Sequence, residues 1–297
     1  MSARWLDLVD PTRAEVDPLL PPGADPDVVE ELVTPAGARE PRPVLEDHGS
    51  YVLGVLVPIV EVSGMLTALE VYFVATPSRL VTVRKTSAGG ATFDVSSLVA
   101  ADDSGRSVGE LVHRLVDDVV DSYLDLLDAT YAEIDTLEDR IDELRPTEVR
   151  ARLAELRHDL LHRRRIVSAT RAAVRRIVDG RIEVGDHELF PPEIERLFAD
   201  TYDTLVRITE ELDVARDLLA GVRDHLQSKI TENQNEVGKK LTVIASLVLV
   251  PSFIVGFFGQ NFAGEFERGY WTVGFSTAVI VFSTLVQLAI FRWRSWI

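Results

Sequence analysis

The sequence contains no cysteine among its 297 residues. This absence excludes thiolate metal sites, disulfide bonds and cysteine nucleophiles. Basic residues are also few, with 31 Lys and Arg against 48 Asp and Glu and a formal net charge of −17. Proteins that bind nucleic acid carry basic patches, so we expect no nucleic-acid partner.

Charge is missing altogether from two long segments near the end of the chain, 241–258 and 271–291. Each is about as long as the roughly 20 residues that a helix needs to cross a hydrocarbon core. Lysines precede the first segment and arginines follow the second, so the positive-inside rule places both ends in the cytoplasm. The start of the chain has no apolar leader. Together with an excess of arginine over lysine, these features predict a multi-pass protein of a bacterial inner membrane with both termini cytoplasmic.

The N-terminal third holds β-branched runs between glycine and proline turns. Residues 51–60, 66–75 and 79–84 are predicted strands. From Val108 onward apolar residues recur at steps of three and four, which predicts two antiparallel helices packed on the sheet. A break at Arg145-Pro146 separates these helices, and Thr147 is the expected cap of the second, which runs from about 148 to 178.

A third helix is expected to start after Pro191-Pro192 and to run without a stop signal into the first membrane segment, over a length of about 100 Å. Its apolar residues alternate three and four apart between Leu205 and Leu226, as in a heptad seam. Such a seam predicts self-association. The alternative is a helix that packs on its own domain.

The predicted organisation is therefore an α+β cytoplasmic domain, with a sheet flanked by helices, joined by a very long helix to two transmembrane helices. The predicted parts are a strand-rich domain (1–105), a helical pair (106–190), a stalk helix (191–240), a first transmembrane helix (241–258), an extracytoplasmic loop (259–270), a second transmembrane helix (271–291) and a basic cytoplasmic tail (292–297).

If several copies of the long helix surround an axis, one stripe of residues would line a pore. The residues on that stripe are Asn235, Gly238, Leu241, Ala245, Leu249, Ser252, Gly256 and Gly259. The stripe is polar at both ends and mainly apolar between them, which suits a hydrated ion and a gate that closes by dewetting. Small residues of this kind also allow close helix packing in lipid, so a pore is one of two interpretations.

The turn between the two apolar segments reads Gly259-Gln260-Asn261. Glycine and asparagine favour turns in any hairpin. A ring of asparagine carboxamides and glycine carbonyls would also present neutral oxygens to a cation that keeps its water shell. Mg²⁺ loses water reluctantly, so such an outer-sphere site would suit it.

Three segments resemble the CorA-type metal ion transporters, a family that includes a ZntB-like zinc branch. They are the residues from Asn235 to Ala245, those from Pro251 to Phe262 with the Gly-Gln-Asn turn, and the basic-aromatic tail Arg292-Trp-Arg-Ser-Trp296. The resemblance covers roughly residues 108–297 well and the N-terminus only in outline. It implies a funnel-shaped homopentamer in the lipid bilayer, with the long helix around the pore.

The resemblance also implies roles for single residues. Gly259 and Asn261, with Gln260 between them, would form the selectivity entrance. Leu241 and Leu249 would be hydrophobic constrictions, and Asn235 and Ser252 would be polar pore positions. Asp200 matches an acidic residue that helps bind a regulatory cation between subunits, although an ordinary surface aspartate is as good an interpretation.

Glutamine replaces the methionine of the usual Gly-Met-Asn signature. This difference weakens the inference that Mg²⁺ in particular is the transported ion. The first expectation is Mg²⁺ influx driven by the membrane potential, with Co²⁺ or Ni²⁺ as further substrates. The second is a Zn²⁺ transporter, coupled to protons, and a third is a non-conducting, metal-sensing scaffold. No catalytic arrangement is recognisable, so we do not expect an enzyme. His158 and His162 have the spacing of a zinc pair, but arginines surround them and favour a solvated face.

Overall fold

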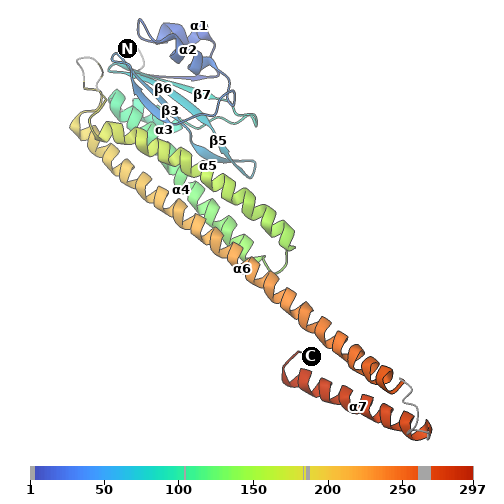
Figure 1. The fold of residues 1–297 in the computed structure, drawn as a ribbon. Helices are drawn as coiled ribbons and strands as arrows, with labels where there is room; N and C mark the ends of the chain where they lie inside the picture. The colour runs from blue at the N-terminus through green and yellow to red at the C-terminus, as the bar shows by residue number, and fades with distance from the viewer. Residues whose placement is uncertain (1–3, 104, 183, 185–187, 260–268, 297) are drawn as a thin grey trace. The chain divides into compact units, whose positions relative to one another are not determined.

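The structure, a computed structural model, describes residues 4–103, 105–182, 184, 188–259 and 269–296 (Figure 1). It divides into two compact units, Met1–Val222 and Arg223–Ile297. The prediction of an α+β domain followed by long apolar helices is confirmed. Gln260 and Asn261 lie outside the described residues.

A five-stranded sheet forms the centre of the first unit. Its strand order is β1 (Trp5–Val9), β7 (Arg79–Lys85), β6 (Glu70–Thr76), β3 (Val52–Leu56) and β2 (Val44–Asp47). The β1 strand pairs in parallel with β7, and the other neighbours are antiparallel. A separate hairpin consists of β4 (Ile59–Val62) and β5 (Met65–Ala68).

The two longest predicted strands, 51–60 and 66–75, are each broken into two, and this part of the prediction is wrong. The first breaks at Pro58, which has no N–H for a ladder bond. The break is held by α4 (Val108–Asp139), because the hydroxyl of Tyr123 donates to the Val57 carbonyl at 3.0 Å and the Ile59 N–H donates to the Ser122 hydroxyl at 3.2 Å. Tertiary contacts therefore decide where these strands end.

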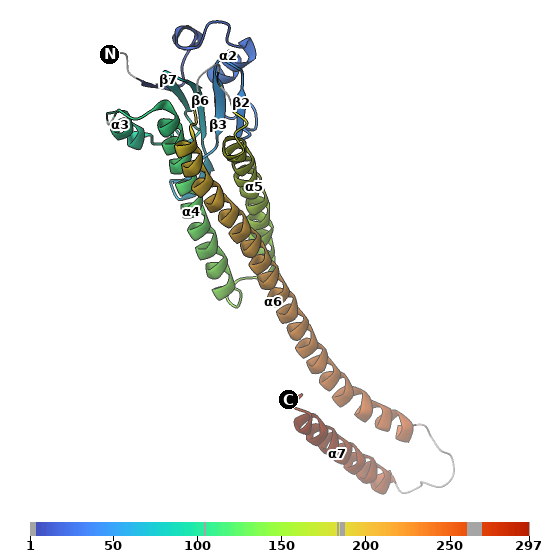
Figure 2. The same cartoon turned by 90° about the vertical axis from the view of Figure 1, so that its left-hand side faces the viewer.

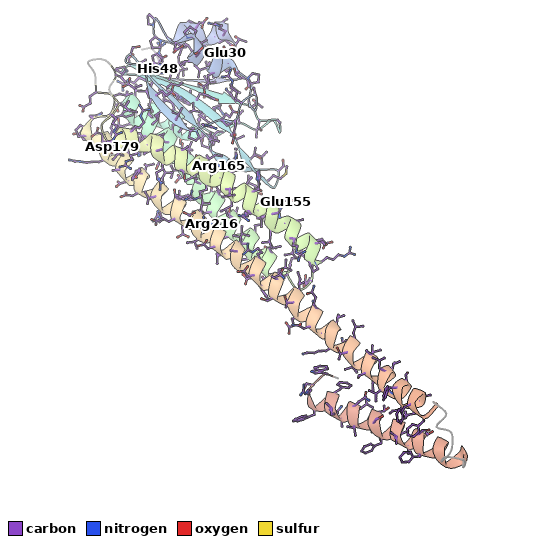
Figure 3. The ribbon with its side chains drawn as sticks, in the orientation of Figure 1. Glu30, His48, Glu155, Arg165, Asp179 and Arg216 are labelled. Carbon is purple, nitrogen blue, oxygen red and sulfur yellow. The ribbon has the colours of Figure 1, made fainter. Side chains whose placement is uncertain are left out.

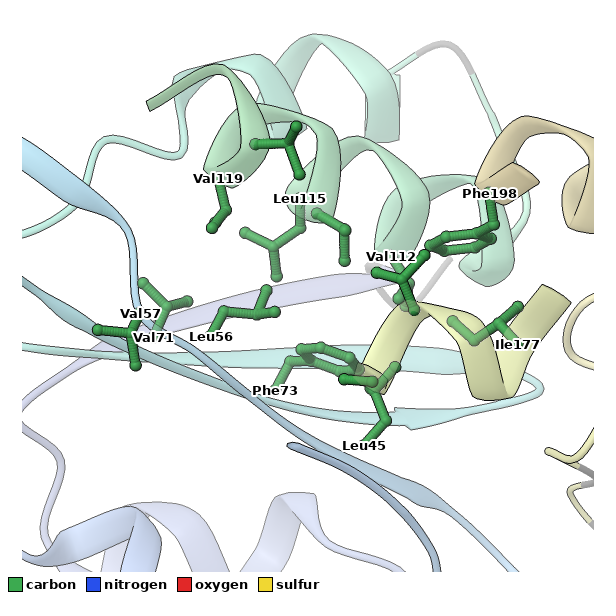
Figure 4. Close-up of a cluster of buried hydrophobic side chains, with 14 of the residues drawn as sticks. Leu45, Leu56, Val57, Val71, Phe73, Val112, Leu115, Val119, Ile177 and Phe198 are labelled. Carbon is green, nitrogen blue, oxygen red and sulfur yellow. The ribbon is translucent and has the colours of Figure 1, made fainter. Parts of the chain in front are cut away.

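Both faces of the sheet are covered, and successive residues of the central strands β3 and β6 are accordingly buried. The helices α1 (Arg13–Val16) and α2 (Pro26–Val33) cover one face, over a cluster that includes Leu53 and Val74. On the other face Leu56 and Phe73 pack against α4 and α5 (Pro146–Val178), and Figure 4 shows this cluster. The main core of the first unit lies on this second face.

Helices α4, α5 and the first part of α6 (Pro192–Gly259) lie side by side in both views of the ribbon (Figures 1 and 2), and the short α3 (Ser96–Asp103) precedes them. The predicted antiparallel pair is present, and the Tyr123 and Thr170 hydroxyls join its two helices at 3.0 Å. α5 begins at Pro146 with Arg145 as its N-cap, whose N–H donates to the Glu148 carboxylate at 3.3 Å. The predicted cap at Thr147 is therefore wrong, because proline favours the first turn of a helix.

The predicted seam of α6 is buried, but within its own domain rather than against a second copy. Leu205, Ile208 and Leu212 are fully buried members of the main core. The expectation that this seam drives self-association is thus wrong, and the alternative interpretation holds for the first unit. Val214 and Leu218 remain exposed on the other side of α6.

Gly109 marks the closest approach of α4 to the segment that precedes α6. A Cβ added there would overlap the Leu189 carbonyl oxygen and lie 2.8 Å from Ile194 Cδ1. We expect Gly109→Ala to lower the free energy of unfolding by about 1–3 kcal/mol, although alanine favours a helix by about 1 kcal/mol. Thermal unfolding of the purified protein in detergent measures the loss.

The matched control is Gly221→Ala on α6, where an added Cβ meets open space. This control should be neutral or slightly stabilising. Equal melting temperatures for the two variants would contradict the close approach at Gly109.

In the second unit, the C-terminal part of α6 and α7 (Gly269–Trp293) form a helical hairpin. Two helices of the described chain are long and apolar enough to cross a membrane, α6 and the part of α7 at Gly274–Trp293. The Phe258 and Phe275 rings meet edge to face, with centroids 6.0 Å apart, so α6 and α7 touch near the turn.

Candidate functional site

The predicted pore stripe forms a continuous exposed face of α6 in the single chain. Leu241 and Leu249 are 61% and 66% exposed, although both are large apolar side chains. The remaining members of the stripe are also exposed: Asn235, Gly238, Ala245, Ser252, Gly256 and Gly259. No described part of the chain covers this face, so it can line a pore axis, pack against a second copy or contact lipid.

The face that packs toward α7 is a different one. Val243 is only 5% exposed, and Ile254 and Phe258 are half-buried. Since each residue turns a helix by about 100°, these positions lie roughly opposite Ala245 and Leu249. The hairpin therefore leaves the predicted stripe free and uses the opposite side of the helix for its own packing.

Polar side chains are present at the Asn235 end of the described stripe and once within it, at Ser252. The Ser252 hydroxyl donates to the Val248 carbonyl of the same helix at 2.7 Å, which leaves its oxygen free to accept. Asn235 shares an open polar surface of α6 with Gln227, Thr231, Glu236 and Lys239. The amide, hydroxyl and carboxylate oxygens of this surface could contact the waters of a hydrated cation.

Asp200 is exposed on α6, and its backbone carbonyl accepts from the Thr204 hydroxyl at 3.1 Å. Among the described residues there is no group of three or more His, Asp or Glu that could hold a metal ion. Asp200 shares its side of α6 with Val214 and Leu218, because these residues are 14 and 18 positions further on, or about four and five turns.

One side of α4 is acidic and carries Asp117, Asp118 and Asp121. Burial raises the pKa of Asp118, which also contacts the Ser97 hydroxyl. Burial also raises the pKa of Asp121, and the nearby Asp117 carboxylate adds to the effect. Between α4 and α6, burial lowers the pKa of His113, whose Nε2 lies 3.2 Å from the Thr201 hydroxyl.

The two histidines of α5 have different surroundings. His158 is exposed, and His162 Nδ1 lies 3.6 Å from the Glu40 carboxylate. His158 therefore lies on the solvated face that the surrounding arginines predicted, whereas His162 is half-buried.

A buried charge network on the α2 face of the sheet was missed by the sequence reasoning. Lys85 is 3% exposed, and its Nζ donates to the Glu31 carbonyl at 2.8 Å and lies 3.6 Å from the Glu70 carboxylate. Glu70 also accepts from the Tyr72 hydroxyl at 3.1 Å and from the Gly37 N–H at 2.9 Å. Burial lowers the pKa of Lys85 and raises that of Tyr72. In the sequence, the alternation of Glu70 and Tyr72 within a strand gave no sign of this network.

Tyr131 joins α4 to α6, because its hydroxyl donates to the Glu211 carboxylate at 2.6 Å. Burial, with the Glu211 carboxylate, raises the pKa of Tyr131 to about 12. A tyrosine with a raised pKa stabilises the fold below pH 10 and loses that contribution as the pH rises toward 12. We expect Tyr131→Phe to reduce the loss of stability between pH 10 and 12 by at most about 2 kcal/mol.

Thermal unfolding at closely spaced pH values measures this slope. The Tyr202→Phe variant serves as the control, since no described residue bonds its hydroxyl. If the stabilities of the wild type and Tyr131→Phe fell equally between pH 10 and 12, the coupling between Tyr131 and Glu211 would be contradicted.

An α+β domain, a helix of 68 residues and a second apolar helix define a membrane protein with a large water-exposed domain. The sequence pattern of the family described as CorA-like Mg²⁺ transporter protein matches residues 2–293. The chain therefore belongs to the CorA-like Mg²⁺ transporter family.

Similar proteins include both metal branches of the family. The chain is 29% identical over 192 residues to the cobalt/magnesium transport protein CorA of Thermotoga maritima, with 63% of this chain and 52% of that protein covered. It is 27% identical over 182 residues to the zinc transport protein ZntB of Cronobacter sakazakii, with 60% and 53% covered. The chain thus spans about half the length of the curated relatives it matches.

The fold is shared with a solved structure of similar size. The complete structure of the CorA magnesium transporter from Methanocaldococcus jannaschii aligns with a TM-score of 0.76 at 19% identity, and covers 99% of this chain and 91% of that one. At this identity the likeness establishes the fold, including the order of sheet domain, long helix and apolar hairpin.

Proposed function

We propose that this chain transports divalent metal cations across a bacterial inner membrane, and that it is not an enzyme. The observation that carries the proposal is the uncovered stripe of α6, from Asn235 to Gly259, opposite the face that packs toward α7. Family membership supports a transporter, and the charge-free stripe supports passage of an ion that keeps its water.

The proposed substrate is Mg²⁺, with Co²⁺ as a second one. A divalent ion gains about 4.6 kcal/mol per 100 mV on entering a negative interior, twice the single-charge value, so influx needs no other energy source. Gly259, Gln260 and Asn261 would form the entrance, where neutral oxygens bind the hydration shell. The relatives include one zinc transport protein, so proton-coupled Zn²⁺ transport is the alternative substrate proposal.

The proposed assembly is a homopentamer in the lipid bilayer, with both termini cytoplasmic. Because the seam between Leu205 and Leu219 is occupied within the chain, copies would meet through the exposed side of α6 that carries Val214 and Leu218. Asp200 lies on that side, so we propose that a regulatory Mg²⁺ binds between copies there.

Ion flux into liposomes that hold the purified protein tests the function. Mg²⁺, Co²⁺ and Zn²⁺ are compared in parallel, with and without a pH gradient. Voltage-driven Mg²⁺ entry that ignores the pH gradient is the expected result. Zinc entry that follows the proton gradient would move the protein to the zinc branch, and no flux of any ion would favour a non-conducting scaffold.

A further inference from the structure

A cleft of about 510 Å³ lies between α5 and the segment of residues 40–44 that leads into β2. It belongs to the first unit and is separate from the stripe on α6. Its volume falls in the range of small-molecule sites, about 300–1,000 Å³. The chemistry of its walls therefore indicates which class of ligand would fit.

Two arginines without acidic partners line this cleft. Arg42 and Arg165 are exposed, and among the residues that the structure describes neither forms an ion pair. Figure 3 labels Arg165 on α5. The preceding residue differs, because Arg164 forms two hydrogen bonds with the Asp213 carboxylate.

The cleft also contains one carboxylate, that of Glu40. His162 Nδ1 lies 3.6 Å from this carboxylate, and among the described residues Glu40 forms no ion pair with Arg42 or Arg165. The lining is otherwise apolar, and includes the buried Pro43 and Ile166. The cleft thus combines two free guanidinium groups with an apolar floor.

We propose that this cleft binds an organic polyphosphate of the nucleoside di- or triphosphate class. Arginine offers a planar fork of donors that matches phosphate oxygens, and two forks suit a ligand with more than one phosphate group. The apolar floor provides contact for the flat base. A metal ion alone does not fit, because the cleft has one carboxylate against two guanidinium groups.

The position of Arg165 gives the ligand a route to the long helix. Arg164, its neighbour, holds Asp213 of α6 at 2.8 and 3.0 Å. Phosphate binding at Arg165 would fix this part of α5 and, through Arg164, the part of α6 that it contacts. The regulatory consequence rests on the proposed transport function, but the binding itself does not.

The test measures binding of ATP, with EDTA present, to the full-length protein in detergent by titration calorimetry. We expect saturable binding that weakens at least tenfold in the Arg42→Ala/Arg165→Ala variant. Adenosine should bind at least tenfold more weakly than ATP, because it lacks the phosphates. The matched control, Arg150→Ala/Arg157→Ala, removes the same charge from exposed positions of α5 outside the cleft and should bind ATP as the wild type does.

Three outcomes would overturn the proposal. They are no saturable ATP binding, equal weakening in both double variants, and arginine-dependent binding to phosphatidic acid vesicles but not to ATP, which would make a lipid headgroup the ligand. Pyrophosphate that binds as tightly as ATP would remove the role of the apolar floor. Binding is measured without transport, so a protein that binds ATP but moves no ion would refute the proposed function alone.

Discussion

Replacement of Asn261 by alanine is expected to reduce divalent cation flux at least tenfold and to leave the assembled protein intact. The proposed entrance binds the water shell of the ion through neutral carboxamide oxygens, and alanine has none. Mg²⁺ gives up its waters reluctantly, so a lost outer-sphere site is not replaced by direct coordination elsewhere. Flux into liposomes at a fixed membrane potential measures the effect, and size-exclusion chromatography reports the assembly.

The matched control is Asn233→Ala. Asn233 is an exposed asparagine of α6 that lies about 120° away from Ala245 around the helix, off the proposed stripe. Its variant should conduct as the wild type does. Unchanged flux in Asn261→Ala would refute the entrance role, whereas a loss in both variants would indicate a general effect of removing carboxamides.

The second large effect is expected at the buried charge network. Lys85→Met would leave the Glu70 carboxylate buried with the Tyr72 hydroxyl and the Gly37 N–H as its remaining partners. Removing one member of a buried ion pair costs about 3–5 kcal/mol, because the other charge stays uncompensated. For a unit of this size that corresponds to a fall in melting temperature of roughly 6–20 °C.

The double variant Lys85→Met/Glu70→Gln separates the charge from the packing. It removes both charges and keeps similar volumes, so we expect it to regain most of the lost stability. Thermal unfolding in detergent compares the wild type with the single and double variants. A double variant less stable than Lys85→Met would show that shape, and not an unpaired charge, governs this site.

The long helices were predictable because their apolar residues repeat over many turns. The unbroken α6 from Pro192 to Gly259 follows directly from the absence of a stop signal. Single residues carry less information: Pro146 and Thr147 are both plausible at a helix start, and only the hydrogen bond between Arg145 and Glu148 decides between them.

The sheet was predicted only in part. Short strands such as β1 are stabilised by distant partners, since the Asp7 carboxylate accepts from the Arg84 guanidinium at 2.6 Å and the Trp5 indole donates to the Thr82 hydroxyl at 3.0 Å. No local pattern reveals a partner more than 70 residues away. The same limit hid the Lys85 network and the seam of α6, whose apolar period is the same whether it packs on a second copy or on its own domain.

The division of α6 into an open stripe and a face that packs toward α7 also constrains the length of the chain. A single inserted or deleted residue turns everything beyond it by about 100°. Such a change near Ser246 would turn Leu249, Ser252 and Gly256 about 100° away from Leu241 and Ala245 around the helix, so the stripe would no longer be continuous. Substitutions that keep residue size are then tolerable over most of this segment, but a change of length by one residue is not. Homologous sequences should therefore differ in residue identity between Asn235 and Gly259 but have the same number of residues there.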